Sequence, residues 1–498
     1  MATTSTTTND ATAASGAACG AGDGAPLADG RNHVVIFPFM AKGHTLPLLH
    51  FATALSTHHS DLSVTLLTTP ANRAFAASRL PSSVRLVELP FPSLPPLPAG
   101  VESTDALPCP SLYPAFLRAT ALLRAPFAEF LASLPSPPLA LVSDFFLGFT
   151  HRAAADAGVR RVVFHGMSCF SMATCKSLVP GSSPAAGAPD APFHVPGMPE
   201  HVWITADEIP DAVVKLADAD DPISRFFIDE GVFSDVLSWG VLVNSFAALD
   251  GDYVAPFESF YLPGARAWLA GPLFLAAGDM PEQDPEGCLA WLDERAAQPG
   301  SVVYVSFGTQ VHVSDAQLDE IVDGLVRSGH PFLWVVRSDT WAPPVDVGPH
   351  SKVVRGWVPQ RSILAHKAVG GFVSHSGWNS VMESLAAGKP IMAWPMIAEQ
   401  HLNARHVVDI VGAGIKVHTK PGGMASVDVI GRVEVEEKVR KLMDADSVAG
   451  KKMRAKATWA QQTAKSAVSE GGTSHAALQE LVAELQRTYG DVVKEGKM

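Results

Sequence analysis

Short apolar runs that alternate with helical segments are the feature of this chain that most restricts its fold. Runs such as HVVIFPF from His33, LALVSDFF from Leu139 and RRVVFHG from Arg160 are apolar over most of their length. Parallel strands joined by helices are buried on both faces and need this composition. A second series follows residue 300, with SVVYVSFG, PFLWVVR, GGFVSH and PIMAWP. The pattern predicts an α/β protein with two doubly wound parallel sheets.

The segments around the two series predict the domain organisation. Residues 262–287 contain several Pro and Gly residues, which is typical of a connection between domains. Residues 1–31 are rich in Thr, Ala and Gly and have no basic residue before Arg31, so a disordered tail is expected rather than a signal or transit peptide. We expect a tail (1–31), an N-terminal domain (32–261), a connection (262–287), a C-terminal domain (288–470) and a final helix across both domains (471–498).

Composition excludes several classes of protein. The 498 residues carry a formal net charge of −13, so no basic surface is expected that would bind nucleic acid. The five cysteines have neither metal-ligand spacing nor a compact disulfide pattern, which favours a reducing compartment. No window reaches the roughly 18 apolar residues of a membrane span. We therefore expect a cytoplasmic, monomeric enzyme without a membrane span.

A block over residues 357–400 contains most of the binding chemistry of the second half. Its sequence is WVPQRSILAHKAVGGFVSHSGWNSVMESLAAGKPIMAWPMIAEQ. Trp357 provides a flat indole and Gln360 a carboxamide, a pair that can stack on a pyrimidine and hydrogen-bond its edge. The start of the block therefore predicts a contact with a nucleoside.

The middle of the block predicts an anion site. The run GGFVSH predicts a short buried strand, and Gly377 to Ser380 predicts a helix start, with the helix closed by Gly388 and Pro390. A helix start presents free N–H groups and the positive end of the helix dipole, which suit a pyrophosphate. His375 can add a further donor.

The end of the block predicts contacts with a sugar. Glu383 lies one turn into the helix, where its carboxylate can accept from a ribose diol. Glu399 and Gln400 follow the next predicted strand and can contact the hydroxyls of a second sugar. The order of these residues thus follows the order of groups along a nucleotide-sugar.

The block resembles the signature box of the plant family 1 UDP-glycosyltransferases. It begins with Trp, ends with Gln and has the 44 residues of that family's box. The resemblance implies a GT-B fold, with two doubly wound Rossmann-like domains facing across a cleft and the UDP-sugar on the C-terminal domain. It also implies inverting transfer of the sugar to a small lipophilic acceptor. Ser376 and Glu399 differ from the commonest pattern, which has Cys and Asp there.

By resemblance, each part of the donor has its own contacts. These are Trp357 and Gln360 for uracil, Glu383 for ribose, His375, Asn379 and Ser380 for the phosphates, and Glu399 and Gln400 for the hexose. The expected set also includes Thr309, Val358, Gly377 and Trp378. Gln400 favours UDP-glucose as the donor by resemblance, and no metal ion or other cofactor is expected.

His44 and Asp144 are the candidate catalytic pair. Transfer to a hydroxyl needs a base that removes the acceptor proton, and histidine suits that role near neutral pH. His44 follows the first predicted strand, and Asp144 ends a later strand of the same half, the edge at which open α/β sheets bind ligands. Asp144 can then accept from the second ring nitrogen and orient the imidazole. The family resemblance assigns these two roles to the same positions.

Several structural alternatives stay open on the sequence alone. Ser380 and Glu383 form an S-x-x-E pattern, so Glu383 can instead belong to a capping box. The D-x-D runs at Asp218 and Asp444 resemble a metal motif of other glycosyltransferases, but each lies in a polar connection and is interpreted as incidental. Neither a P-loop nor a convincing dinucleotide motif is present.

Rival functions also stay open. A related enzyme can hydrolyse or epimerise a UDP-sugar without an acceptor, and a silent binding protein can keep the nucleotide block, although it would not need His44 and Asp144. Attack through carbon rather than oxygen is a third alternative. The acceptor itself, expected to be a plant secondary metabolite or hormone, depends on loops of the first half that carry no readable code.

Overall fold

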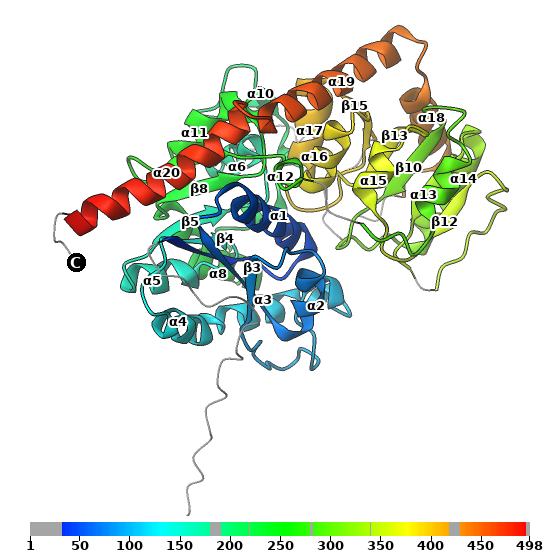
Figure 1. The fold of residues 1–498 in the computed structure, drawn as a ribbon. Helices are drawn as coiled ribbons and strands as arrows, with labels where there is room; N and C mark the ends of the chain where they lie inside the picture. The colour runs from blue at the N-terminus through cyan, green and yellow to red at the C-terminus, as the bar shows by residue number, and fades with distance from the viewer. Residues whose placement is uncertain are drawn as a thin grey trace, which may run out of the picture.

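Two parallel sheets form the framework of the protein (Figure 1). The computed structural model describes residues 32–179, 191–218, 220–278, 282–338, 340–417 and 429–494. The tail predicted over residues 1–31 lies outside this range. Each sheet belongs to one half of the chain, as the two series of apolar runs predict.

The first sheet has seven strands in the order β3-β2-β1-β4-β5-β8-β9, all parallel. Its strands are β1 (His33–Phe37), β2 (Ser63–Thr68), β3 (Val84–Glu88), β4 (Ala140–Asp144), β5 (Arg160–Phe164), β8 (Gly240–Val243) and β9 (Arg266–Leu269). A separate antiparallel pair joins β6 (Phe193–His194) and β7 (Trp203–Ile204). The strand order reverses direction between β1 and β4. His44 follows β1, and Asp144 is the last residue of β4.

Helices cover both faces of the first sheet because strand side chains alternate between its faces. On β1, Val34 and Ile36 pack in one core and Val35 and Phe37 in another. The longer helices are α1 (Lys42–His58), α3 (Tyr113–Ala121), α4 (Arg124–Ser133), α5 (Phe149–Asp156) and α6 (Cys169–Ser177). Shorter ones are α2 (Arg73–Ala77), α7 (Asp211–Val214), α8 (Pro222–Phe226), the π-helix η6 (Phe227–Val232), α9 (Phe233–Val236), α10 (Ala247–Asp250), α11 (Val254–Glu258) and α12 (Leu273–Ala276).

The second sheet has six parallel strands in the order β12-β11-β10-β13-β14-β15. They are β10 (Val302–Ser306), β11 (Phe332–Val335), β12 (Lys352–Val354), β13 (Val369–Ser374), β14 (Ile391–Ala393) and β15 (Gly414–Lys416). The surrounding helices are α13 (Cys288–Asp293), α14 (Asp315–Ser328), α15 (Gln360–Ala365), α16 (Trp378–Ala386), α17 (Gln400–Arg405), the π-helix η8 (His406–Val411) and α18 (Arg432–Met443). Two doubly wound sheets are thus confirmed as the fold class.

Two strands of the first sheet were not expected from the sequence. β3 carries Arg85 and Glu88 and is less apolar than the runs that predict strands. β9 lies inside the predicted connection 262–287, so the first sheet extends to Leu269 and the connection begins later than predicted. Gly264 and Gly271 flank this four-residue strand, and the turn signals around it conceal its apolar core.

The last two helices join the two halves. α19 (Val448–Val468) packs against α16 through alanines such as Ala460 and Ala464. After a short turn, α20 (Thr473–Lys494) runs along the first half, where Leu478, Leu481, Val482 and Leu485 enter the same core as β1. Figure 1 shows this pair as the orange and red helices crossing from one half to the other.

None of the helices among the described residues is both long and apolar enough to cross a bilayer.

Candidate active site

His44 and Asp144 form a hydrogen-bonded pair at the carboxyl edge of the first sheet. His44 lies in the first turn of α1, directly after β1, and Asp144 is the last residue of the adjacent strand β4. His44 Nδ1 donates to Asp144 Oδ2 at 2.8 Å. The other carboxylate oxygen accepts from the backbone N–H of Phe146 at 3.0 Å. The two side chains are 100 positions apart in the sequence, and the neighbouring strands β1 and β4 bring them together at this edge.

The pKa of His44 reflects opposing influences. Burial lowers it, whereas the charge of Asp144, the hydrogen bond to that carboxylate and the charge of Glu399 raise it, and the net pKa lies above the usual value. Because a carboxylate can only accept, the proton of the neutral ring lies on Nδ1. Nε2 then carries the lone pair that a general base requires.

Aromatic rings surround the imidazole of His44. Phe146 lies edge-on at 5.3 Å between ring centroids, and Phe39 lies at 5.7 Å. The two phenyl rings stack on each other at 4.6 Å. Burial raises the pKa of Tyr113 of α3, and the negative charge of Asp144 raises it further. The surroundings of the pair are therefore flat and apolar, which suits an aromatic or similarly lipophilic molecule.

The predicted anion site lies at the start of α16. β13 ends at Ser374, Gly377 is the N-cap residue and Trp378 begins the helix. His375 lies in this turn, and burial lowers its pKa to about 4, so the ring is neutral near pH 7. Gly308, after β10, has φ of +75°, and a Cβ there would lie 2.6 Å from the His375 ring. The glycine thus allows two strand ends to approach closely around the turn.

Gln360 and Glu383 are in direct contact. Gln360 Nε2 donates to Glu383 Oε2 at 2.7 Å and to Ser380 Oγ at 3.1 Å, while its Oε1 accepts from Tyr304 at 3.0 Å. Burial raises the pKa of Glu383 to about 7, against the opposing effect of Gln360. Ser380 lies inside α16 and is not its N-cap, so the S-x-x-E capping box does not form. The residues predicted to bind uracil and ribose therefore lie side by side.

Trp357 lies between the two halves and is 40% exposed. Lys42 of α1 lies 5.2 Å from the centroid of its ring, and Phe75 of α2 packs edge-on at 5.9 Å. Arg79 lies 5.7 Å from the same centroid. The indole thus belongs to the second half but is bordered by cations of the first.

The phosphate-site residues also meet the first half. Asn379 Nδ2 donates to the backbone oxygen of Gly43 at 2.5 Å, next to His44. Asn244, at the end of β8, donates to Asn379 Oδ1 at 3.5 Å. The start of α16 therefore lies beside the candidate catalytic pair.

Glu399 and Gln400 begin α17. Glu399 Oε1 accepts from Asn403 at 3.2 Å, and burial raises the pKa of its carboxyl group. Gln400 is buried and its Oε1 accepts from two backbone N–H groups, those of Met396 and Ile397, both at 3.0 Å. The Gln400 amide nitrogen can still donate to a ligand.

Three of the residues predicted to contact the donor can do so only through main-chain atoms. Trp378 is 2% exposed, stacks on His406 and donates its indole N–H to the oxygen of Asn244 at 2.9 Å. Val358 packs in the core of the second half. Gly377 has no side chain, so all three can contact a ligand only through main-chain groups. Thr309 lies on the turn after β10, as predicted.

Among the described residues, no cluster of three or more His, Cys, Asp and Glu side chains has the arrangement of a metal site. Asp444 of the second D-x-D run accepts from the backbone N–H groups of Asp446 and Ser447, at 3.0 and 3.1 Å. Its carboxylate thus supports the local turn before α19.

Comparison with known proteins identifies the family. The model of the "UDP-glucoronosyl and UDP-glucosyl transferase" family matches residues 271–443. The chain is 36% identical over 473 residues to UDP-glycosyltransferase 90A1 of Arabidopsis thaliana, covering 91% of this chain and 96% of that protein. The chain belongs to the plant family 1 UDP-glycosyltransferases. The protein is therefore an enzyme, a UDP-dependent glycosyltransferase that acts on small-molecule acceptors.

Solved structures of the family share the fold. UGT73P12 of Glycyrrhiza uralensis, complexed with glycyrrhetinic acid 3-O-monoglucuronide, aligns with a TM-score of 0.80 and 29% identity, over 94% of this chain and 98% of that one. UGT2 of Phytolacca americana, complexed with UDP-2fluoro-glucose and pterostilbene, aligns with a TM-score of 0.75 and 28% identity, over 91% and 99% of the two chains. The GT-B fold implied by the resemblance is thus confirmed.

Sequence reasoning missed several residues around the site of this UDP-glycosyltransferase. Tyr304 on β10 bonds Gln360, and Asn244 at the end of β8 bonds Asn379. Tyr304 lies in the middle of a predicted strand and gave no such signal, whereas Asn244 directly follows one, so its place at the carboxyl edge of the sheet was the available signal. Lys42 and Arg79 carried no such signal, because their position beside Trp357 depends on how the halves pack.

Proposed function

We propose that the enzyme transfers glucose from UDP-glucose to a hydroxyl of a small aromatic acceptor, with inversion, and that His44 is the general base. The observation that supports this most directly is the 2.8 Å bond between His44 Nδ1 and Asp144 Oδ2, which directs Nε2 away from the carboxylate. Glu399 and Asn379 of the opposite half lie close to this pair. The base therefore faces the residues proposed to hold the sugar and the phosphates.

The proposed step is a single displacement. His44 Nε2 takes the proton of the acceptor hydroxyl as its oxygen attacks the anomeric carbon from the side opposite to UDP. The new carbon–oxygen bond forms as the bond to the diphosphate oxygen breaks, and UDP leaves with that electron pair. Asp144 stabilises the imidazolium that results. Base catalysis of this kind contributes roughly 10²- to 10⁴-fold to the rate.

The leaving diphosphate would lie at the start of α16. Its free N–H groups, together with His375, Asn379 and Ser380, can stabilise the developing negative charge. We propose that this donor set acts without a metal ion. The uracil would stack on Trp357 and the ribose would bond Glu383, which requires the present bond between Glu383 and Gln360 to open or to be shared.

The donor and acceptor classes rest on the relatives and on the rings beside His44. The Phytolacca enzyme was solved in complex with UDP-2fluoro-glucose and pterostilbene. Phe146, which stacks on the buried Phe39, would pack against an aromatic acceptor of that kind. A cytoplasmic location and a monomeric state stay predictions from the sequence.

The test combines one substrate screen with one variant. The purified enzyme is offered UDP-glucose, UDP-galactose and UDP-glucuronate with phenolic, terpenoid and hormone acceptors, and products are identified by mass spectrometry and by the NMR coupling of the anomeric proton. We expect β-glucosides from UDP-glucose, and loss of transfer in His44→Ala with UDP affinity retained. His151→Ala, a partly exposed histidine of α5, is the matched control. Near-normal turnover of His44→Ala would remove His44 from the base role.

A further inference from the structure

Arg161 is a buried cation directly behind the proposed catalytic pair. It lies on β5 and is 2% exposed. Its guanidinium donates to Ser143 Oγ at 2.7 Å, to the backbone oxygen of Asp144 at 3.0 Å, to that of Ser234 at 3.0 Å and to Ser238 Oγ at 3.1 Å. All four acceptors are uncharged. The side chain therefore links the end of β4 to α9 and the residues that follow it.

The buried charge is balanced over a longer distance. Burial lowers the pKa of Arg161 to about 10, and the negative charges of Asp235 and Asp144 oppose this effect, together with Tyr261. Asp235 is already engaged, because it accepts from His165 at 2.9 Å and forms an ion pair with Lys176. Asp144, the smaller of the two carboxylate influences on Arg161, is engaged by His44.

We propose that Arg161 is a positioning residue of the transfer reaction, one that fixes the end of β4 and thereby aims Asp144 at His44. The inference rests on the proposed role of His44. The contacts to Ser143 Oγ and to the Asp144 carbonyl hold the backbone from which the Asp144 side chain extends.

The charge of Arg161 should also act on the titration of the pair. A positive charge opposes the imidazolium form of a neighbouring histidine. Removing that charge should therefore raise the pKa of His44 and move the acid limb of activity to higher pH. Among the described residues, two other titratable groups face the pair: Glu399, whose charge raises the pKa of His44, and the neutral phenol of Tyr113, whose pKa is raised by burial and then by Asp144.

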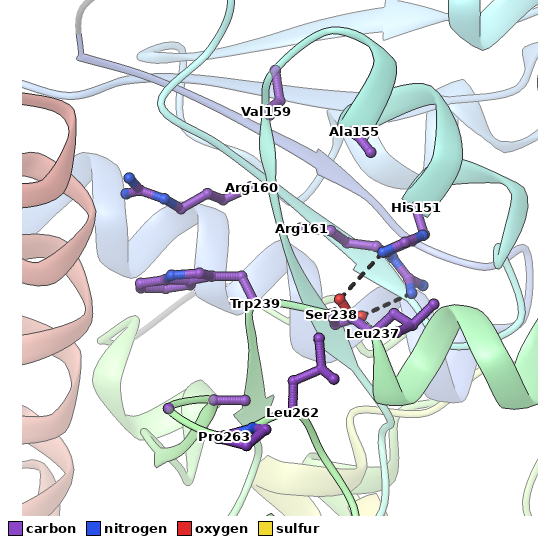
Figure 2. A pocket seen from close by; sticks show the side chains of 12 residues that line it. His151, Ala155, Val159, Arg160, Arg161, Leu237, Ser238, Trp239, Leu262 and Pro263 are labelled. Carbon is purple, nitrogen blue, oxygen red and sulfur yellow. Dashed lines mark hydrogen bonds between the residues drawn. The ribbon is translucent and has the colours of Figure 1, made fainter. Parts of the chain in front are cut away.

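A surface pocket gives access to the site of the guanidinium. It has a volume of about 370 Å³ and is lined by Arg161 and Ser238, with His151, Leu237 and Leu262 around them. Figure 2 shows Arg160 and Arg161 leaving β5 in opposite directions, with Arg161 pointing toward Ser238. Arg160 instead donates to Leu485 of α20 at 3.4 Å. Arg160 is therefore a matched control, because its guanidinium bonds α20 whereas that of Arg161 bonds the end of β4.

The first test compares Arg161→Met, Arg161→Lys and Arg160→Met. The pKa of His44 is read by NMR of histidine-labelled protein, with the His44 signal assigned from His44→Ala, so that no acceptor is needed. We expect Arg161→Met to raise this pKa by on the order of one pH unit, with Arg161→Lys and Arg160→Met close to the parent. The acid limb of kcat/KM should move by the same amount. A folded Arg161→Met with unchanged pKa and pH profile would overturn the proposal, as would an equal shift in Arg161→Lys.

The second test is chemical rescue and also covers the case in which Arg161→Met does not fold. Arg161→Ala is assayed with and without methylguanidine at millimolar concentration, which can enter through the pocket. We expect a loss of kcat of at least about tenfold, partly restored by methylguanidine and not by methylammonium, and no effect on Arg160→Ala. Absence of rescue in a folded variant counts against the proposal. If instead His44→Ala retained turnover, the proposed base would fail independently of these results.

Discussion

Two residues of the block 357–400 have a left-handed backbone conformation although neither is glycine. Ser376 has φ of 66° and Ala398 has φ of 52°. Ser376 directly follows His375, and Ala398 directly precedes Glu399; His375 and Glu399 are both proposed ligand residues. Such conformations cost of order 1–3 kcal/mol and persist where the surroundings enforce them. Here Asn403 bonds the carbonyl of Ser376 at 2.9 Å, which holds the turn in place.

Replacing Asp144 by Asn tests the orientation of the base. The change removes the charge that raises the pKa of His44 and can leave the ring in the wrong tautomer. We expect kcat to fall on the order of 10²- to 10⁴-fold, and any remaining acid limb to move to lower pH. Steady-state kinetics over a range of pH measure both effects. A fall in kcat with an acid limb at higher pH would contradict this assignment.

Replacing Trp357 by Ala tests the uracil contact. Loss of a base–aromatic stack costs roughly 1–3 kcal/mol, so UDP affinity should fall about five- to 150-fold. Isothermal titration calorimetry measures this directly. Trp459 of α19 is a suitable control, because it is 37% exposed and also lies beside a lysine, Lys456. Equal affinity of Trp357→Ala and Trp459→Ala would exclude the stacking role.

The turn between β13 and α16 depends on a neighbouring strand end. Gly308→Ala places a Cβ against the His375 ring and also requires left-handed backbone at φ +75°. Gly329→Ala has the same backbone requirement, at φ +76°, but meets no atom within 4 Å. We expect Gly329→Ala to lose about 1–2 kcal/mol of stability and Gly308→Ala clearly more, with weaker UDP binding. Thermal unfolding with and without UDP distinguishes them, and identical behaviour would contradict the crowding argument.

The elements that could be predicted from the sequence were those with a local signature. The strand and helix around Gly377, and the helix capped by Ser314, appear where their patterns place them, and Ser314 accepts from the N–H of Gln317. β9 could not be predicted, because four residues between turn signals carry too little periodicity. Contacts such as Lys42 with Trp357 were also beyond prediction, since they depend on packing between segments distant in sequence.

Across the two halves, α20 contributes core side chains to a sheet built from the opposite end of the chain. Leu481 is 1% exposed within that core. Leu481→Ala should lower the free energy of unfolding by about 2–5 kcal/mol. Val448→Ala, at an 87% exposed position of α19, should change it by less than about 0.5 kcal/mol. Urea denaturation followed by tryptophan fluorescence measures both, and equal stabilities would show that α20 is dispensable to the first sheet.

Polar contacts reinforce the same docking of α20. Ser474 donates to the oxygen of Gly271 at 2.6 Å, Arg266 pairs with Glu480 at 2.5 Å, and Gln486 reaches Asp61 at 2.9 Å.

The position of α20 bears on how the protein is made. Chains emerge from the ribosome amino end first, and domains commonly fold as they emerge. Here the first sheet is translated early, but the leucines that complete one of its cores come from residues 478–485, which are translated after the whole second sheet. Until then the surface beneath α20 stays uncovered on the nascent chain. The amino-terminal half is therefore the last of the two to reach its final packing, and its exposed apolar face is where a chaperone would be needed.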